Sequence, residues 1–445
     1  MPSPEFADSL VSRALGLGAD QAEAYVRSSR SLSVEVKDQA CDSLRSSRSF
    51  GYGLRVIRDG CLGFAYSTDP GDAEPVIRNA VDSARNNDRD SYLGLPESGD
   101  YPDVEVHDPA VAQIREEDAL ALAMEIEKAA QGTDRRITKV RKAAATFSES
   151  EHLIVNSRSV RASYTSTACS AQITAIAEEQ GEAQVGSDYS GSRFLRDVSF
   201  GEVGRQAAGH ALRLLGSRRI SAQKTTVILD RSVSVDFLGI LASGLSAEAV
   251  QKGRSLLSGR LGQKVMHGGI TVLDNGLLPG GLGSSPFDAE GVGVRKKVLI
   301  EQGVLQGYLH NTYTAAKGSG VSTGNAVRGG FSSMPTVGIT NLYIEPYQGP
   351  GRATPADLYS LAGSGLHIYD AMGVHTANPV TGDFSVGVTG IWFENGLAKY
   401  PVKEAVLSGN ILDLFGKAEA LGSDLRFYGN IGAPSLIITD LDISA

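Results

Sequence analysis

The amino-acid sequence predicts an α+β fold in two parts, and three observations lead to this prediction. Apolar residues recur at helical and at strand spacing in turn through the first half of the 445-residue chain. Glycine then becomes dense, with 9 glycines in residues 1–100 and 20 in residues 251–350. Short strand-like runs between Gly, Asn and Pro fill the second half. We therefore expect an N-terminal mixed α/β domain over residues 1–220 and a Gly-rich, largely β C-terminal domain over residues 221–445.

The first part contains helices and strands in alternation. Asp59-Gly60 separates two alternating runs, which is typical of a tight β-hairpin. Pro75 suits the first turn of a helix, where its missing N–H is not needed. The predicted elements are, in order, a helix over residues 4–15, a strand over 31–37, a hairpin over 52–56 and 62–66, a helix from residue 74, a helix over 109–130, two or three strands over 143–176 and a helix over 198–215.

The second part begins with a short apolar strand and one long helix, and then becomes mostly β. Phe237, Leu238, Leu241 and Leu245 form the apolar face of this helix. The predicted elements are a strand over 224–229, a helix over 232–252, short strands over 269–274, 298–303, 342–345 and 434–439, and a further helix over 407–421.

The charge and cysteine content exclude several classes of protein. The net charge is −9 and the isoelectric point about 5.4, so nucleic acid is not an expected partner. Three cysteines are too few for a disulfide framework and fit a reducing compartment. No apolar run approaches the ~18 residues that cross a bilayer, and the start lacks the pattern of a signal peptide. We expect a cytoplasmic protein with no membrane contact.

Searches for catalytic motifs find nothing that favours an enzyme acting alone. Ser221 and Lys224 have Ser-x-x-Lys spacing, but they lead into a strand, so their side chains need not meet. The glycines of residues 280–283 lack a following helix signal, which favours a turn over a nucleotide loop. No two of the seven histidines lie closer than eight residues, so none forms a recognisable zinc pair.

Several phrases occur in an order that resembles the TldD/PmbA family over essentially the whole chain. They include Gly18-Ala-Asp-Gln-Ala-Glu, Gly53-Leu-Arg-Val, Pro286-Phe-Asp-Ala-Glu-Gly, Gly303-Val-Leu, Ser322-Thr-Gly-Asn-Ala, Asn378-Pro-Val-Thr-Gly-Asp-Phe-Ser and Glu394-Asn-Gly. The resemblance implies an N-terminal α/β domain, a β-rich C-terminal domain and work on peptides. In the family's best-known pair, a TldD-type chain binds the metal through His-Glu-x-x-x-His and a later cysteine.

This chain lacks those ligands, which makes it similar to the PmbA/TldE branch. At the positions aligned with the motif it has Leu238, Gly239 and Ser243, and no cysteine follows Cys169. The resemblance implies no metal or other cofactor in this chain and zinc in a TldD-type partner. It also implies a heterodimer with that partner, a homodimer of the chain alone, a peptide substrate and no catalytic residue here.

Polar residues within the family-like phrases are the candidate substrate-binding residues. Next to Gly or Pro such residues also stabilise turns through local hydrogen bonds, and this alternative remains open. The candidates are Asp288, Glu290, His310, Thr323, Asn325, Arg328, Asn378, Thr381, Asp383 and Ser385.

Three functions follow from these observations. The first is a subunit without metal in a metalloprotease complex that processes or degrades small or unfolded peptides, where this chain shapes the cleft. The second is a peptide- or protein-binding or assembly factor without protease involvement, as for family members described as modulators of DNA gyrase. The third is an enzyme that acts alone through unrecognised chemistry. Because the ligands are missing, autonomous metalloprotease activity is not expected.

Overall fold

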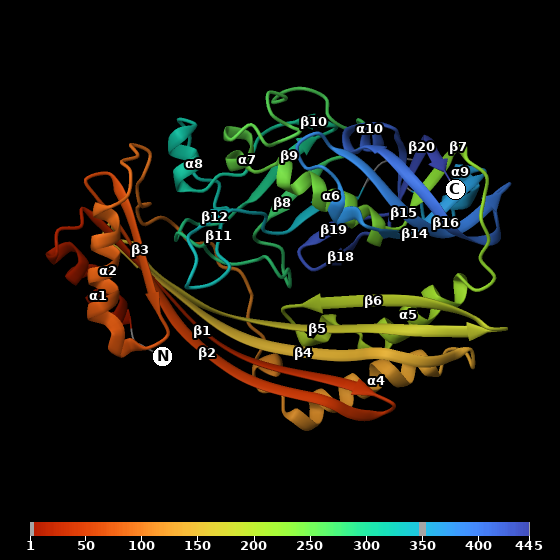
Figure 1. Ribbon diagram of the computed structural model, residues 1–445, viewed down its shortest axis with the longest axis horizontal. Helices are drawn as coiled ribbons and strands as arrows, with labels where there is room; N and C mark the ends of the chain where they lie inside the picture. The colour runs from red at the N-terminus through yellow and green to blue at the C-terminus, as the bar shows by residue number, and fades with distance from the viewer. Residues whose placement is uncertain (1–3, 347–352, 445) are drawn as a thin grey trace.

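The structure is a computed structural model that describes residues 4–346 and 353–444, and it confirms the α+β fold class. Its N-terminal part is one antiparallel sheet in the order β3-β2-β1-β4-β5-β6, with helices packed against it (Figure 1). The strands are β1 (Gln21–Lys37), β2 (Ala40–Arg58), β3 (Cys61–Ser67), β4 (Ile137–Asn156), β5 (Arg161–Glu179) and β6 (Glu182–Ser192). The helices are α1 (Pro4–Gly16), α2 (Ala73–Arg85), α3 (Pro109–Ala112), α4 (Glu116–Gln131) and α5 (Phe200–Arg213).

These helices build two separate apolar cores on one face of the sheet, and the short α3 contributes Val111 to the core that contains α4 and α5. Ala24 and Val26 of β1 pack with α1 and α2, whereas Leu32 and Val34 of the same strand pack with α4 and α5. Residues two apart on a strand share a face, so these even-numbered positions point to the same side. The odd-numbered side chains of β1, including Tyr25, therefore point to the opposite face of the sheet.

The C-terminal part contains two six-stranded sheets that lie above the long N-terminal sheet in Figure 1. One has the order β10-β9-β8-β13-β19-β18, the other β16-β15-β14-β7-β20-β17, and β11 and β12 form a separate pair. The strands are β7 (Gln223–Leu229), β8 (Val272–Asn275), β9 (Lys296–Glu301), β10 (Val304–Leu305), β11 (Ala326–Val327), β12 (Thr336–Val337), β13 (Leu342–Ile344), β14 (Gly365–Met372), β15 (Asp383–Glu394), β16 (Leu397–Asn410), β17 (Ala418–Leu421), β18 (Arg426–Tyr428), β19 (Ile431–Ala433) and β20 (Leu436–Ser444).

Helix α6 is the central helix of this part, because it contacts β14 of one sheet and β18 and β19 of the other. Phe237, Leu238 and Leu241 on its apolar face are completely buried in the largest core of the protein. The C-terminal helices are α6 (Arg231–Gly244), α7 (Ala247–Gln251), α8 (Thr312–Lys317), α9 (Leu358–Ala362) and α10 (Ile411–Gly416). No helix among the described residues is long and apolar enough to cross a membrane.

Most predicted elements are present, and the hairpin at Asp59-Gly60 is confirmed, with both residues at positive φ (52° and 73°). Two predicted helices are interrupted. The 109–130 segment forms α3 and α4, because Arg115 is extended. The 232–252 segment breaks between α6 and α7, where the backbone N–H of Ala247 donates to Leu309 O across the fold. The division into folding units at residue 220 stays a prediction.

The helix predicted over residues 407–421 is confirmed only at its centre, and both of its ends form strands instead. Strand β16 continues to Asn410, a helix of 6 residues follows as α10, and Ala418–Leu421 forms β17. Asn410 caps α10 by accepting from the backbone N–H of Leu412 at 3.0 Å. Pairing of β16 with β15 and β20, and of β17 with β20, overrides the helical spacing of the apolar residues.

Candidate functional site

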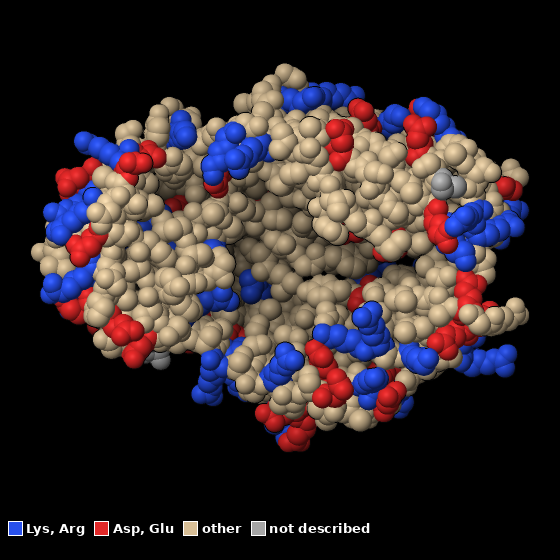
Figure 2. Space-filling view, viewed as in Figure 1, with Lys and Arg blue, Asp and Glu red and all other residues tan. Residues whose placement is uncertain are grey.

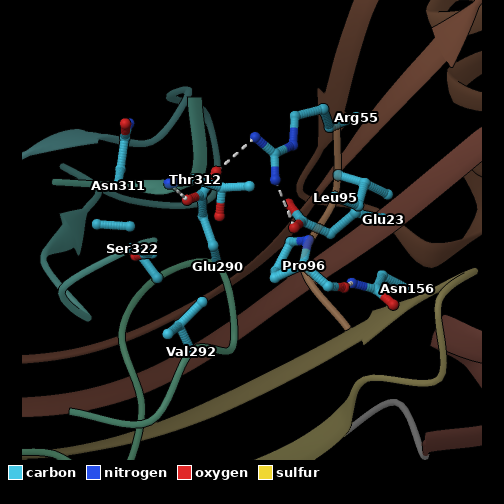
Figure 3. A network of polar contacts seen from close by, with 12 residues as sticks. Glu23, Arg55, Leu95, Pro96, Asn156, Glu290, Val292, Asn311, Thr312 and Ser322 are labelled. Carbon is cyan, nitrogen blue, oxygen red and sulfur yellow. Dashed lines mark hydrogen bonds and ion pairs between the residues drawn. The ribbon is translucent and has the colours of Figure 1, made fainter. Parts of the chain in front are cut away.

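Two neighbouring strands and two loops from the C-terminal part meet in a buried charge cluster, of which Figure 3 shows Glu23, Arg55 and Glu290. Arg55 of β2 donates from Nη2 to Glu23 Oε2 of β1 at 2.6 Å, and from Nη1 to Glu290 Oε1 at 2.9 Å. Arg328 donates to the other oxygen of Glu23. We call Glu23, Arg55, Glu290 and Arg328 the junction cluster, since it joins the N-terminal sheet to loops of the C-terminal part.

The charges of the junction cluster stabilise one another. Burial alone would lower the pKa of Arg55, but Glu23 and Glu290 raise it above its usual range. Burial alone would raise the pKa of Glu290, but Arg55 and the backbone N–H of Thr312 lower it. Removing one partner would leave the others charged and without water, which is costly. The cluster therefore fixes the position of the loop that carries Glu290.

Asp288 orders the same loop through backbone hydrogen bonds. Its Oδ1 accepts from the N–H of Glu290 at 2.9 Å and of Val292 at 3.0 Å, and its Oδ2 accepts from Ala326 at 2.9 Å. Burial and the neighbouring Glu290 carboxylate raise the pKa of Asp288 to about 7 against the effect of these N–H donors. Asp288 thus links its own loop to β11.

A second buried network lies beside the first and contains Asn325 and Thr323. Lys297 Nζ lies 3.0 Å from Asp274 Oδ2 and 2.9 Å from Asn325 Oδ1. Thr323 Oγ1 donates to Asn325 Oδ1 at 2.8 Å and accepts from the backbone N–H of His310 at 2.8 Å. His310 Nδ1 has no hydrogen-bond partner among the described residues, and burial lowers its pKa.

Six of the predicted site residues therefore come together at the junction of the two parts, and most of their polar atoms bond to protein groups. These six are Asp288, Glu290, His310, Thr323, Asn325 and Arg328. The contacts show how the side chains order the loops. Direct contact of these residues with a substrate stays a prediction.

The other four predicted residues lie in and after a turn at the start of β15. Asn378 Oδ1 accepts from the backbone N–H of Val380 at 2.9 Å and of Thr381 at 3.3 Å. Asp383 Oδ1 accepts from Asn410 Nδ2 at 2.9 Å, and Ser385 is exposed on β15. The structure does not place these four with the junction cluster, and a binding role for them also stays a prediction.

The positions aligned with the family's metal motif lie on α6. Leu238 is completely buried in the core, Gly239 offers no side chain, and Ser243 donates to Ile240 O at 2.8 Å. Gly239 and Ser243 line a cavity of about 480 Å³ with Asp236 and His375. Burial and nearby Asp370 raise the pKa of Asp236 to about 6.

These residues do not fit a zinc ion, since leucine and glycine provide no ligand atom. In the part of the chain that the structure describes, no three His, Cys, Asp or Glu side chains are grouped for a metal ion. Likewise, Lys224 Nζ lies 3.6 Å from Asp440, while Ser221 precedes β7, so the structure shows no Ser221–Lys224 pair.

Glu23 and Arg55 are candidate functional-site residues that were not predicted from the sequence. The sequence did contain one indication of this site, a charged residue within an otherwise apolar strand. Arg55 lies between Leu54 and Val56, which are both buried in the core formed with α1 and α2. Arg55 and Glu290 also line a cavity of about 690 Å³. At this cavity Tyr313 donates to Asp90 Oδ2 at 2.7 Å, a second link between the two parts.

Family models match most of the chain. The model of the PmbA/TldA metallopeptidase C-terminal domain matches residues 222–445, that of the central domain residues 109–215, and that of domain 1 residues 22–87. The metalloprotease PmbA of Escherichia coli O157:H7 is 29% identical over 444 residues, which cover 98% of this chain and 95% of that protein. A PmbA homolog of Haemophilus influenzae is 29% identical over 432 residues, covering 95% and 92% of the two chains.

Solved structures show the same fold. A proposed modulator of a DNA gyrase from Thermotoga maritima superposes with a TM-score of 0.91 at 27% identity, over 99% of each chain. TldE from Thermococcus kodakarensis has a TM-score of 0.91 at 21% identity, over 99% of this chain and 100% of that chain, which is a likeness of fold. From the family models and relatives together, the chain belongs to the PmbA/TldD metallopeptidase family.

Proposed function

We propose that this chain is the subunit without a metal site in a two-chain peptidase of the PmbA/TldD family. The observation that supports this most directly is the position of Leu238 in the core, beside Gly239 and Ser243, at the positions aligned with the metal motif. Leucine and glycine side chains have no atom that can bind a metal ion, and the burial of Leu238 leaves no room for one beside it. The metal chemistry would therefore belong to a zinc-binding TldD-type partner.

In this proposal the chain shapes the cleft that admits small or unfolded peptides. The junction cluster supports this role, because its buried charges fix the loop around Glu290 against the N-terminal sheet. A cleft with fixed walls limits which peptides reach the partner's metal. We further propose that the protein is cytoplasmic and forms a homodimer in the absence of the partner, as two copies of one fold can share an equivalent surface.

The test is reconstitution with a TldD-type chain that contains His-Glu-x-x-x-His. The two chains are mixed, separated by size and assayed for cleavage of unfolded peptides with and without a chelator. The expected result is a mixed complex whose chelator-sensitive activity exceeds that of either chain alone. A partner in which the motif glutamate is replaced is the matched control, and it should form the complex without cleavage.

A second candidate is a binding or assembly factor, which the likeness to a proposed modulator of a DNA gyrase favours. If the chain is monomeric alone and leaves the partner's cleavage unchanged, the subunit proposal fails and the binding factor takes its place. Binding of gyrase subunits by the isolated chain would be the corresponding positive result.

A further inference from the structure

A cavity of about 430 Å³ lies between the strands of the N-terminal sheet and loops of the C-terminal part. Its floor is the face of β1, β4 and β5 that points away from the helices, and residues 282–289 and 326–328 form much of the opposite wall. Figure 2 shows the protein surface hollowed between these two parts. The volume falls in the range of about 300–1,000 Å³ that is typical of small-ligand sites.

The charged groups of this cavity are mostly positive, although the chain as a whole is acidic. Arg27, Arg193 and Arg328 line it, and within the described part of the chain Asp288 is its one acidic lining residue. The Asp288 carboxylate accepts three backbone hydrogen bonds, so it is already engaged. Arg193 is also engaged, since it donates to the carbonyl oxygens of Thr167, Gly281, Leu282 and Ser284.

Arg27 and Arg328 retain donors without partners. The Nε of Arg27 and the Nη1 of Arg328 are buried and have no hydrogen-bond partner among the described residues. The side chain of Arg328 is only 1% exposed, and its guanidinium also lies 4.8 Å from the centre of the Tyr25 ring. Buried donors of charged groups are rarely left unpaired, because the loss of water costs free energy. The side chains that hold these two donors both line the cavity, and their positive charges favour an anionic ligand.

Three aromatic rings form part of the floor and add no competing charge. Tyr25 Oη lies 3.0 Å from His152 Nδ1, and the His152 ring stacks on Tyr164 with centroids 4.6 Å apart. Burial lowers the pKa of His152 to about 3, so the ring is neutral near pH 7. A hydrogen bond from Tyr25 to Nδ1 leaves the proton on Nε2, which can then donate to a ligand.

We propose that this cavity binds the C-terminal carboxylate of a peptide, with Arg27 and Arg328 as its charged partners. The hydroxyl groups of Ser148, Ser150 and Ser166 line the same cavity and offer neutral hydrogen bonds to peptide amides. The inference deepens the proposed function and rests on its peptide substrate. In this inference the chain binds the C-terminal end of the peptide, and this binding sets the distance from that end to the site of cleavage.

The test compares two probes on the full-length chain by isothermal titration calorimetry. The probes are tetraalanine with a free carboxylate and tetraalanine amide. We expect the free acid to bind roughly 10- to 100-fold more tightly, as for the loss of one charge-assisted hydrogen bond. The variant Arg27→Gln should bind the acid as weakly as the wild type binds the amide. Arg45→Gln is the matched control, because it removes the same charge from an exposed position on the same sheet, away from the cavity.

Each other outcome contradicts the proposal. A carboxylate site is contradicted if the acid and the amide bind equally or if neither binds. It is also contradicted if Arg27→Gln and Arg45→Gln lose the same amount of affinity for the acid. Inorganic phosphate is the third probe. If it binds with the same dependence on Arg27 and tetraalanine does not displace it, the cavity is a phosphate site. Carboxylate-selective binding without activation of any TldD-type partner would refute the proposed function and leave this inference standing.

Discussion

Arg55 Nη1 lies 2.9 Å from Glu290 Oε1, and this contact joins residues 235 positions apart in the sequence. Both side chains are almost completely buried, and Glu23 on the adjacent strand shares the same guanidinium. The contact therefore depends on the whole fold, and its loss would be felt by both parts of the molecule.

Replacing Arg55 should destabilise the protein strongly. In Arg55→Met, Glu23 loses one of its two arginine partners and Glu290 loses its own, which should cost about 3–5 kcal/mol. Chemical denaturation measures the change. Arg58→Met is the matched control on the same strand, where the contact with exposed Asp59 is worth less than about 1 kcal/mol. Similar losses in both variants would contradict a special role for the junction cluster.

Stability should fall between pH 6.5 and pH 4 because of His367. Burial lowers the pKa of His367 to about 4, with Arg213 acting in the same direction and Asp230 against it. Below about pH 6.5 the unfolded chain takes up a proton at this residue that the folded chain does not, so acid favours unfolding. At pH 5 the effect is on the order of 2 kcal/mol.

The measurement is the free energy of unfolding at pH 7.5 and pH 5 for wild type and His367→Gln. The variant should lose less stability on acidification, whatever its stability at pH 7.5. His375→Gln, at an exposed position, should retain the wild-type dependence. Parallel pH curves for wild type and His367→Gln would show that His367 is protonated to the same extent in both states.

Two glycines of α5 should respond in opposite directions to substitution by alanine. A Cβ at Gly204 would lie 2.1 Å from Ile126 O of α4, so Gly204→Ala should force the helices apart and cost about 1–3 kcal/mol. A Cβ at Gly209 meets only the end of Arg213, at 3.9 Å. Gly209→Ala should therefore stabilise by up to about 1 kcal/mol through helix propensity. Thermal melts followed by circular dichroism compare them, and equal effects would refute the close approach of α4 and α5.

The purified chain should contain no stoichiometric zinc. The reason is the set of side chains on α6, where Leu238 is in the core and Gly239 has no ligand atom. Elemental analysis after dialysis against a zinc-containing and then a zinc-free buffer provides the measurement. Retained zinc at one ion per chain would point to a site assembled from dispersed histidines.

The elements with strong local periodicity could be predicted from the sequence. The elements whose structure depends on pairing with a strand far away in the sequence could not. The hairpin at Asp59-Gly60 depends on local turn chemistry, so it could be read directly. The residues on either side of α10 have helical spacing, but they form β16 and β17 because both pair with β20, a distant strand that the local pattern does not reveal. Of the hairpin and the strand pairing, only the hairpin could be derived from neighbouring residues.

The residues of the candidate site likewise fall into those that the sequence predicted and those that it did not. Asp288 and Asn325 were found because they lie in phrases similar to a known family, and the structure places them in adjacent buried networks. Glu23 and Arg55 were missed because their strands showed only one buried face in the sequence pattern. The second face is buried by loops about 235 residues away, which no local pattern indicates.

The two apolar cores on one face of the N-terminal sheet have a consequence for how this part unfolds. Strand β1 supplies Val26 to one core and Val34 to the other, and β4 supplies Val155 and Phe147 in the same way. If one core unfolded alone, half of β1 and half of β4 would lose their packed side chains while the other half of each strand stayed in the sheet. The two cores should therefore exchange their amide hydrogens at similar rates, as one cooperative unit, although they share no side chain.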